Sequence, residues 1–184
     1  MAGEKPGTNW LSCFGAGEVK IAGLLEIQVV GHFDWGRRKN LRQARTPTMR
    51  QNRNRLLIER FYLEMWNRFD KTIFPDILAE DLRFRGSLGQ SKSGHAEFGE
   101  YVDFIQRAFP DFSNEIEEII SEGDKAFAKL TYRGTHRGEV FGIAPTGRLI
   151  QYAGAAVFKF RGDRIAEVWV LGDTHGLISQ LEAK

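Results

Sequence analysis

Two ionisable side chains, Asp173 and His136, occur on or just after apolar segments, where they could act as an acid or a base. Asp173 follows an alternating apolar segment that contains Trp169. An indole and an apolar cavity disfavour a charged carboxylate, which raises its pKa toward that of a useful base. His136 shares the apolar face of another alternating segment with Tyr132, from which it could donate to a substrate carbonyl and stabilise an enolate. The pair therefore suggests removal of a proton next to a carbonyl group.

Each of these residues also has a structural alternative. Asp173 could cap the last helix by accepting a hydrogen bond from the backbone amide of His175 or Gly176. His136 could be a core or rim histidine that orients the following turn. His175 could pair with Asp173, or it could be a solvated residue on the helix surface. The sequence leaves these alternatives open.

The same residues include side-chain types that can bind a metal ion. The side chains of His95, His136, His175 and Asp173 include two-histidine, one-carboxylate combinations that bind metals in other proteins. The chain nevertheless lacks the short spacings that typify metal sites, such as two histidines with one or three residues between them. We therefore expect no metal ion.

The elements that would position these residues follow from the spacing of apolar residues. Before Pro110, steps of three and four residues indicate helices, and after it a period of two indicates strands joined by short turns. Helices followed by an antiparallel meander are typical of an α+β fold. A curved antiparallel sheet wrapped over about three N-terminal helices would form a cone that encloses an apolar pocket. The expected helices are 54–69, 73–78, 95–109 and a short one ending at Leu181, and the expected strands are 82–85, 112–121, 124–136, 149–160 and 165–171.

Aromatic side chains on these elements would line or floor the pocket, although an aromatic stripe is also typical of an ordinary core. We expect the substrate to contact six of them together with one histidine near the last helix. These residues are Tyr62, Trp66, Phe84, Tyr132, Tyr152, Trp169 and His175. Tyr101 and Phe158 are further candidates for the pocket lining.

Composition excludes several functional classes. The chain has 184 residues, one cysteine (Cys13) and a formal net charge of +2, with 42% hydrophobic and 12% aromatic residues. A single cysteine excludes an internal disulfide framework and any multi-cysteine metal site. The small net charge does not indicate nucleic-acid binding, and no apolar run is long enough to span a membrane. We expect a cytoplasmic globular protein.

The charge is unevenly distributed along the chain. Residues 1–48 carry seven Lys and Arg against four Asp and Glu, and the remainder carries 19 against 20. The first stretch is glycine-rich and has no clear apolar period, whereas Met49 begins the first well-patterned segment. We therefore expect residues 1–48 to be a poorly ordered basic extension and residues 49–184 to be the functional domain.

Short motifs in the patterned region resemble a known family. In order they are Ala108-Phe109-Pro110-Asp111, Glu122-Gly123-Asp124, Gly134-Thr135-His136-Arg137-Gly138, Pro145-Thr146-Gly147-Arg148, Gly162-Asp163-Arg164-Ile165, Glu167-Val168-Trp169, Asp173 and Gln180-Leu181. Together they resemble the SnoaL-like polyketide cyclases of the nuclear-transport-factor-two-like superfamily, over about residues 50–182. The resemblance implies a cone-shaped α+β fold and a homodimer formed through the sheet. It also implies acid–base catalysis without a cofactor, with Asp173 as the best match for the catalytic aspartate.

The function expected from the residues and the resemblance is intramolecular aldol ring closure. The substrate would be a small apolar or aromatic carbonyl compound, polyketide-like in character, with neither nucleic acid nor membrane as a partner. A related isomerase or hydrolase would use the same cavity. The alternatives are a non-catalytic small-molecule-binding module of the same fold and a dimeric scaffold without a functional cavity.

Overall fold

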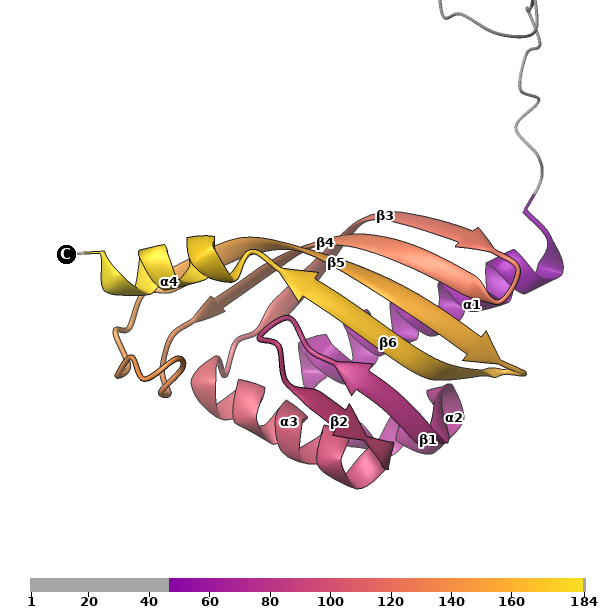
Figure 1. Cartoon of the computed structure of the whole chain (residues 1–184), viewed down its shortest axis with the longest axis horizontal. Helices are drawn as coiled ribbons and strands as arrows, with labels where there is room; N and C mark the ends of the chain where they lie inside the picture. The colour runs from indigo at the N-terminus through magenta and orange to yellow at the C-terminus, as the bar shows by residue number, and fades with distance from the viewer. Residues whose placement is uncertain (1–46, 184) are drawn as a thin grey trace, which may run out of the picture. The chain divides into compact units, whose positions relative to one another are not determined.

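The computed structural model of the chain describes residues 47–183, so all but the last two residues of the expected extension 1–48 lie outside the described residues. The described elements, shown in Figure 1, include six strands and several short helices. The helical elements are α1 (Met49–Glu59), η1 (Arg60–Trp66), η2 (Lys71–Ile73), α2 (Phe74–Ile77), α3 (Gly94–Ala108) and α4 (Thr174–Glu182). The strands are β1 (Leu78–Arg85), β2 (Ser91–Ser93), β3 (Ser113–Glu122), β4 (Lys125–Thr135), β5 (Leu149–Arg161) and β6 (Arg164–Gly172). None of the described helices combines the length and the apolar character needed to cross a membrane.

The first helical segment begins with a capping box and changes its geometry halfway. The Thr48 side chain accepts from the Gln51 amide, and the Gln51 side chain accepts from the Thr48 amide. After Glu59 the α-helix widens into the π-helix η1, in which the Asn67 amide donates to the Tyr62 carbonyl five residues earlier. The sequence predicted one continuous α-helix here. Periodicity locates the apolar face but does not distinguish the two hydrogen-bond patterns.

The six strands form one mixed sheet in the order β2-β1-β6-β5-β4-β3. Strands β3 to β6 form the predicted antiparallel meander, with long uninterrupted pairing between β4 and β5. The expectation of a wholly antiparallel sheet is wrong, because β1 runs parallel to β6 and pairs with β2 in the antiparallel sense. Alternation within a strand reveals its buried face but not its distant pairing partner, which explains this error. Among the described strands, β2 and β3 remain edges, so the sheet is not closed.

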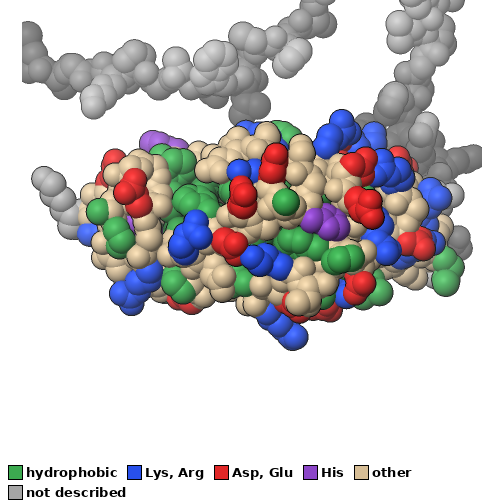
Figure 2. All heavy atoms as spheres, turned by 90° about the horizontal axis from the view of Figure 1, so that it is seen from below, with side chains coloured by type: hydrophobic (Ala, Val, Ile, Leu, Met, Phe, Trp, Pro, Cys, Tyr) green, Lys and Arg blue, Asp and Glu red, His purple; other side chains and the backbone are tan. Residues whose placement is uncertain are grey.

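Helical segments α1, η1 and α3 lie against one face of the curved sheet, as Figure 1 shows, and the core lies between these two layers. The predicted inward alternation of β4 is confirmed at Ala126, Ala128, Leu130 and Tyr132, all of which are buried. Figure 2 views the molecule from below Figure 1 and shows acidic, basic and apolar side chains intermixed over that face. One face of the sheet thus packs against α1, η1 and α3.

A buried amide attaches the beginning of α1 to the sheet. Asn54 is buried, and its Nδ2 donates to Ser121 Oγ at 3.2 Å and to the Gly123 carbonyl at 3.1 Å. These two bonds connect the helix to the turn between β3 and β4. A polar side chain is therefore needed at this point of the core.

We predict that Asn54→Ala lowers the free energy of unfolding by about 1–3 kcal/mol, because the Gly123 carbonyl and Ser121 hydroxyl lose their donor. The matched control is Asn52→Ala, on the exposed side of the same helix. It makes the same change in helix propensity without removing a buried bond. Denaturant titration of the two variants checks the difference, and equal effects would contradict the role assigned to Asn54.

Candidate active site

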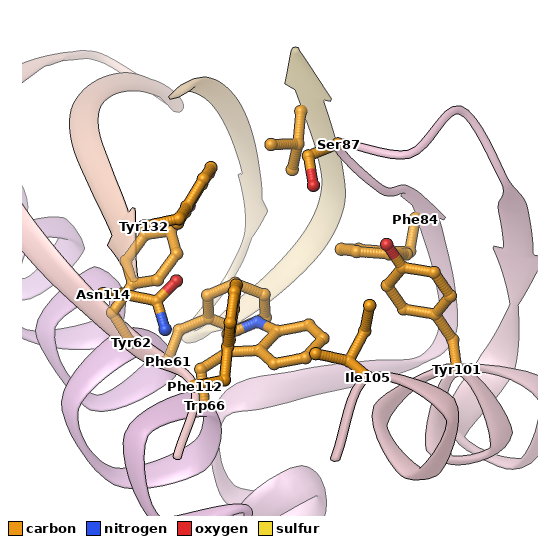
Figure 3. Close-up of a pocket in the computed structure, with 11 residues that line it drawn as sticks. Phe61, Tyr62, Trp66, Phe84, Ser87, Tyr101, Ile105, Phe112, Asn114 and Tyr132 are labelled. Atoms are coloured by element: carbon orange, nitrogen blue, oxygen red, sulfur yellow. The ribbon is translucent and has the colours of Figure 1, made fainter. Parts of the chain in front are cut away.

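A small cavity lies between η1, α3 and the inner face of the sheet (Figure 3). The side chains leave about 20 Å³ of open space, which is room for about one water molecule. Organic ligands occupy pockets of roughly 300–1,000 Å³, so an organic ligand requires lining side chains to move. The lining residues are Phe61, Tyr62, Trp66, Phe84, Ser87, Tyr101, Ile105, Phe112, Asn114, Tyr132 and Val170.

The π-helix η1 supplies one wall of this cavity. Its buried residues Phe61, Tyr62 and Trp66 all belong to the lining. Short π-helical segments are uncommon and occur frequently at functional sites, because they reposition side chains that an α-helix would space differently. The change from α1 to η1 therefore coincides with the cavity.

All four tyrosines of the chain are buried around this space. Tyr62, Tyr101 and Tyr132 line it, and Tyr152 packs against Tyr132 with ring centroids 5.0 Å apart. They come from η1, α3, β4 and β5 respectively. Four phenol groups from four distant elements are thus brought together by the fold.

Glycines make room for two of these rings. A Cβ at Gly154 would lie 2.2 Å from Tyr132 Cε2, and one at Gly86 would lie 2.4 Å from the Tyr101 hydroxyl. No side chain can occupy those positions without moving the tyrosines. The absence of a Cβ at these two positions therefore helps to define the cavity wall.

Two of the tyrosine hydroxyls are associated with the turn between β1 and β2. The Tyr152 hydroxyl and Ser87 Oγ form a hydrogen bond of 3.3 Å. Burial raises the pKa of Tyr152 to about 12, and contact with Ser87 partly offsets the effect. Burial also raises the pKa of Tyr101, which is lowered in turn by Ser87 and the Leu88 amide. Both phenols remain protonated at neutral pH.

The Tyr62 hydroxyl differs, because it is fully buried and makes no hydrogen bond among the described residues. The Tyr132 hydroxyl lies near enough to influence it but outside hydrogen-bond geometry. Burial raises the pKa of both phenols well above the usual range. An unpaired buried hydroxyl costs about 1–3 kcal/mol, so this position is destabilising unless a partner arrives.

Asn114 adds an amide to the same end of the cavity. Its Nδ2 donates to Asn67 Oδ1 at 2.8 Å, and its backbone amide donates to the same oxygen at 2.7 Å. Figure 3 shows its carboxamide beside Tyr62 and Tyr132, whereas Ser87 and Tyr101 lie toward the opposite end. Since Asn67 holds the nitrogen, the Asn114 Oδ1 is left as an acceptor.

The cavity contains no charged side chain. Within residues 47–183, its polar side-chain groups are three phenols, one aliphatic hydroxyl, one carboxamide and the indole N–H of Trp66. The same part of the chain contains no cluster of three His, Cys, Asp or Glu side chains that could hold a metal ion. The chemistry available at the lining is therefore hydrogen bonding by neutral groups and contact with aromatic rings.

Asp173 lies outside this lining. It is exposed, and its Oδ1 accepts from the Gly176 amide at 2.8 Å, which is the helix-capping alternative that the sequence left open. It follows Gly172 directly, and a Cβ built at Gly172 would lie 2.8 Å from the Ser87 Cβ of the lining. In the sequence, Asp173 therefore follows a glycine that lies against the cavity wall. Its carboxylate, however, caps α4.

His136 is fully buried but does not line the cavity. Its Nδ1 accepts from the Thr146 amide at 3.2 Å, and its ring packs against Phe109 at 5.6 Å between centroids. Its Nε2 has no hydrogen-bond partner among the described residues. These contacts make it part of the turn packing, in keeping with the structural alternative, and the structure does not bring it to the side chain of Asp173.

Trp169 and His175 also lie away from the cavity. Trp169 is 42% exposed on the outer face of the sheet, where the Arg85 guanidinium lies 5.2 Å from its ring centroid. His175 is exposed on α4. Neither belongs to the lining, whereas the predicted residues Tyr62, Trp66, Phe84 and Tyr132 do.

Sequence reasoning missed two polar lining residues, Ser87 and Asn114. Ser87 lies in the Gly- and Ser-rich segment that follows the predicted strand 82–85, where no apolar pattern indicates which side chains point inward. Asn114 shares the inward parity of Phe112 and Ile116 on the predicted strand, so its inward direction was available from alternation. An isolated asparagine at an inward-facing position among apolar residues was the sequence signal that could have identified Asn114 as a lining residue.

The tyrosine cluster predicts a steep alkaline transition. Each phenol has a pKa raised above the unfolded value of about 10, so its stabilising contribution is complete below that pH and is lost as pH rises through the folded pKa. Between the unfolded pKa of about 10 and its own folded pKa, each tyrosine should lower the free energy of unfolding by about 1.4 kcal/mol per pH unit. Tyrosinate absorbance should therefore rise together with the loss of circular dichroism. Titration near pH 10 in a chain that stays folded would contradict this prediction, and Tyr152→Phe should reduce the slope.

The structure resembles solved proteins across most of its described part. A protein of Jannaschia sp. CCS1, assigned as a SnoaL-like polyketide cyclase, matches with a TM-score of 0.70 at 16% identity, covering 76% of this chain and 98% of that one, which shows the fold. TsrD of Streptomyces laurentii matches with a TM-score of 0.65 at 25% identity, covering 73% and 98%. IdmH of Streptomyces antibioticus, assigned as a polyketide cyclase, matches with a TM-score of 0.61 at 26% identity, covering 69% and 96%.

The sequence itself gives the family. No curated protein matches the chain significantly. The model of the SnoaL-like polyketide cyclase family matches residues 56–181, which include η1, α3, all six strands and all but the last residue of α4. This chain belongs to the SnoaL-like polyketide cyclase family.

Proposed function

We propose that this chain binds a small uncharged carbonyl compound in the tyrosine-lined cavity and closes a ring in it by an intramolecular aldol reaction. The observation that carries the proposal is a buried aromatic cavity whose polar groups, among residues 47–183, are all neutral. Family membership and the likeness to IdmH support the choice of a cyclase. Aromatic walls suit a polyketide-like substrate, and neutral donors suit its carbonyl oxygens.

The reaction needs only a proton transfer and one new carbon–carbon bond. A base removes a proton next to one carbonyl, the resulting enolate attacks a second carbonyl of the same molecule, and the alkoxide takes a proton back. The balance is an isomerisation, so no oxidant or reductant is consumed. Phenols that remain protonated at neutral pH can donate to the enolate oxygen as charge develops there. We assign this role to the tyrosine hydroxyls of the cavity.

The base we propose is Asp173, acting directly or through one water. It adjoins Gly172, where an added Cβ would lie 2.8 Å from the Cβ of the lining residue Ser87. Its carboxylate would have to turn from the Gly176 amide toward the ligand. His136 receives no reacting step in this scheme, since its Nδ1 is held by Thr146.

Substitutions of Asp173 separate the base from the helix cap. Asparagine caps helices as well as aspartate, so Asp173→Asn should retain the melting temperature while turnover falls by about 100-fold or more. The control is Asp173→Ala, which loses the cap and should cost about 1 kcal/mol of stability as well. The two measurements are thermal unfolding and assay against a panel of uncharged dicarbonyl compounds. Full activity of Asp173→Asn would refute the mechanism.

The alternative function is a binding module without turnover. It is favoured by one observation, that no carboxylate or imidazole among the described residues lines the cavity. A metabolite retained in native mass spectra, together with no turnover on the panel, would support it. An isomerase or hydrolase would instead show turnover without ring closure.

We also propose that the chain is a homodimer through the outer face of the sheet. Four exposed apolar side chains, Ile120, Phe127, Val157 and Trp169, are paired in register across four neighbouring strands. Neighbouring positions carry both signs of charge, including Lys125, Lys159 and Glu167. A second copy presents the same row, so it offers both apolar contact and opposite charges.

The expected effect of Val157→Lys, at the centre of this row, is a shift from dimer to monomer, because a buried charge would face the partner's apolar side chains. Leu56→Lys, an equivalent change at an exposed position of α1, should leave the assembly unchanged. Analytical ultracentrifugation over a range of concentrations measures both. A wild-type chain that is monomeric at every concentration would refute the proposed dimer.

A further inference from the structure

The turn between β1 and β2 lies where the lining of the cavity reaches solvent. Ten of the eleven described lining residues are buried, and Ser87 is the one that is partly exposed. Figure 3 shows Ser87 at the end of the cavity away from Asn114. Since only about 20 Å³ is open, an organic ligand can enter only if part of the lining moves. The exposure of Ser87 identifies this turn as the part of the wall that is freest to do so.

The turn is held together by its own backbone bonds, so it can move as one unit. The Gly86 amide donates to the Gln90 carbonyl at 2.9 Å, and the Gly89 amide donates to the Gly86 carbonyl at 3.0 Å. Gly89 has a φ of +87°, which suits glycine and completes a three-residue hairpin loop. Strand β2 has three residues and pairs only with β1 among the described strands, so no second strand of the described sheet holds the turn.

The residue before the turn, by contrast, is fixed to β6. Arg85 Nη1 donates to the Val170 carbonyl at 2.7 Å, and the Arg85 guanidinium lies 5.2 Å from the Trp169 ring centroid. Gly86 follows immediately, and glycine adopts a wider range of backbone conformations than other residues do. We therefore place the hinge at Gly86, where the turn can pivot without disturbing the sheet.

The turn touches the rest of the cavity wall through Ser87 and Leu88. Ser87 Oγ and the Tyr152 hydroxyl are 3.3 Å apart, which is longer than the roughly 2.5–3.0 Å usual between two hydroxyl groups. Ser87 and the Leu88 amide are also close enough to the Tyr101 hydroxyl to lower its pKa. The Leu88 side chain is half-buried against the core. A long hydrogen bond and a half-buried leucine are weak attachments, as a reversible closure requires.

We propose that residues 86–90 form a gate over the cavity and that the hydrogen bond between Ser87 and Tyr152 is its latch. In the open form the turn swings away on Gly86, which withdraws Ser87 and Leu88 from the wall and admits a ligand. In the closed form the same turn excludes water from the apolar interior. The inference rests on the proposed function, because it assumes that a ligand enters the cavity, but the gate can be tested without one.

A cysteine placed in the buried wall reports the opening directly. Val170 lines the cavity and is 5% exposed, and a cysteine side chain is slightly smaller than that of valine. In the full-length chain with Cys13→Ser and Val170→Cys, iodoacetamide therefore reaches the thiol only when the cavity opens. At low reagent concentration modification is slower than reclosing, so the labelling rate is proportional to the open fraction. Ile105→Cys, in place of Val170→Cys, supplies a second reporter on α3.

Two matched serine substitutions test the latch in this reporter chain. Ser87→Ala removes the hydroxyl that bonds Tyr152 and should raise the labelling rate about fivefold, the effect of losing one weak hydrogen bond. Ser91→Ala makes the same chemical change at an exposed position of β2 and should change the rate by less than about twofold. Both reporter cysteines should give the same pattern.

Urea separates opening of the gate from unfolding of the whole chain. A local movement exposes little surface, so labelling in low urea should be independent of the urea concentration, whereas labelling through global unfolding accelerates with it. Labelling that follows the urea slope of global unfolding would overturn the gate. Equal labelling rates for Ser87→Ala and Ser91→Ala would overturn the latch and, with it, the inference.

The outcome for the gate is separable from the outcome for the cyclase. Faster labelling of the Ser87→Ala chain, with no turnover of the dicarbonyl panel by the wild-type chain, would retain the gate and refute the cyclase. Turnover by the wild-type chain, with equal labelling of the two serine variants, would retain the cyclase and refute the gate.

Discussion

Phe61 of η1 packs edge to face against Phe158 of β5 at 5.6 Å and lies parallel to Phe98 of α3 at 6.1 Å. This three-ring contact joins the π-helix, the sheet and α3, and it fixes the positions of the neighbouring residues Tyr62 and Trp66. Since both of these belong to the cavity lining, the same contact that holds the core together also defines the candidate site. The packing of the core and the shape of the cavity thus depend on one arrangement of rings.

The sequence predicted those parts of the fold that local periodicity determines. Strand β4 was expected at 124–136 and observed at Lys125–Thr135, and α3 was expected at 95–109 and observed at Gly94–Ala108. The parallel pairing of β1 with β6 was not predictable, because it joins residues 84–87 positions apart through backbone bonds that no side-chain pattern reports. The π-helix was missed for a related reason, since its apolar residues also fit an α-helical face.

The candidate site also contains some features that could be predicted from the sequence and others that could not. Tyr62, Trp66, Phe84 and Tyr132 were predicted for the pocket because large rings on inward faces must be buried somewhere in the core. The role of Asp173 is harder to predict from the sequence. A carboxylate at the end of β6 can either cap a helix or contact a ligand, and its position in the sequence is the same in both cases. The structure shows it in contact with Gly176, the first of these uses.

The neutral lining has a consequence for any reaction in the cavity. The burial that raises the pKa of each phenol also disfavours an enolate formed beside it, since both are anions in the same apolar surroundings. An enolate can persist there only if hydrogen bonds replace its hydration and if its charge is spread over a conjugated system. Neutral donors such as Tyr62 and Tyr132 supply the first condition, and an aromatic carbonyl compound supplies the second. If the chain performs the proposed aldol reaction, its cavity should therefore favour substrates whose conjugation delocalises the charge over isolated ketones.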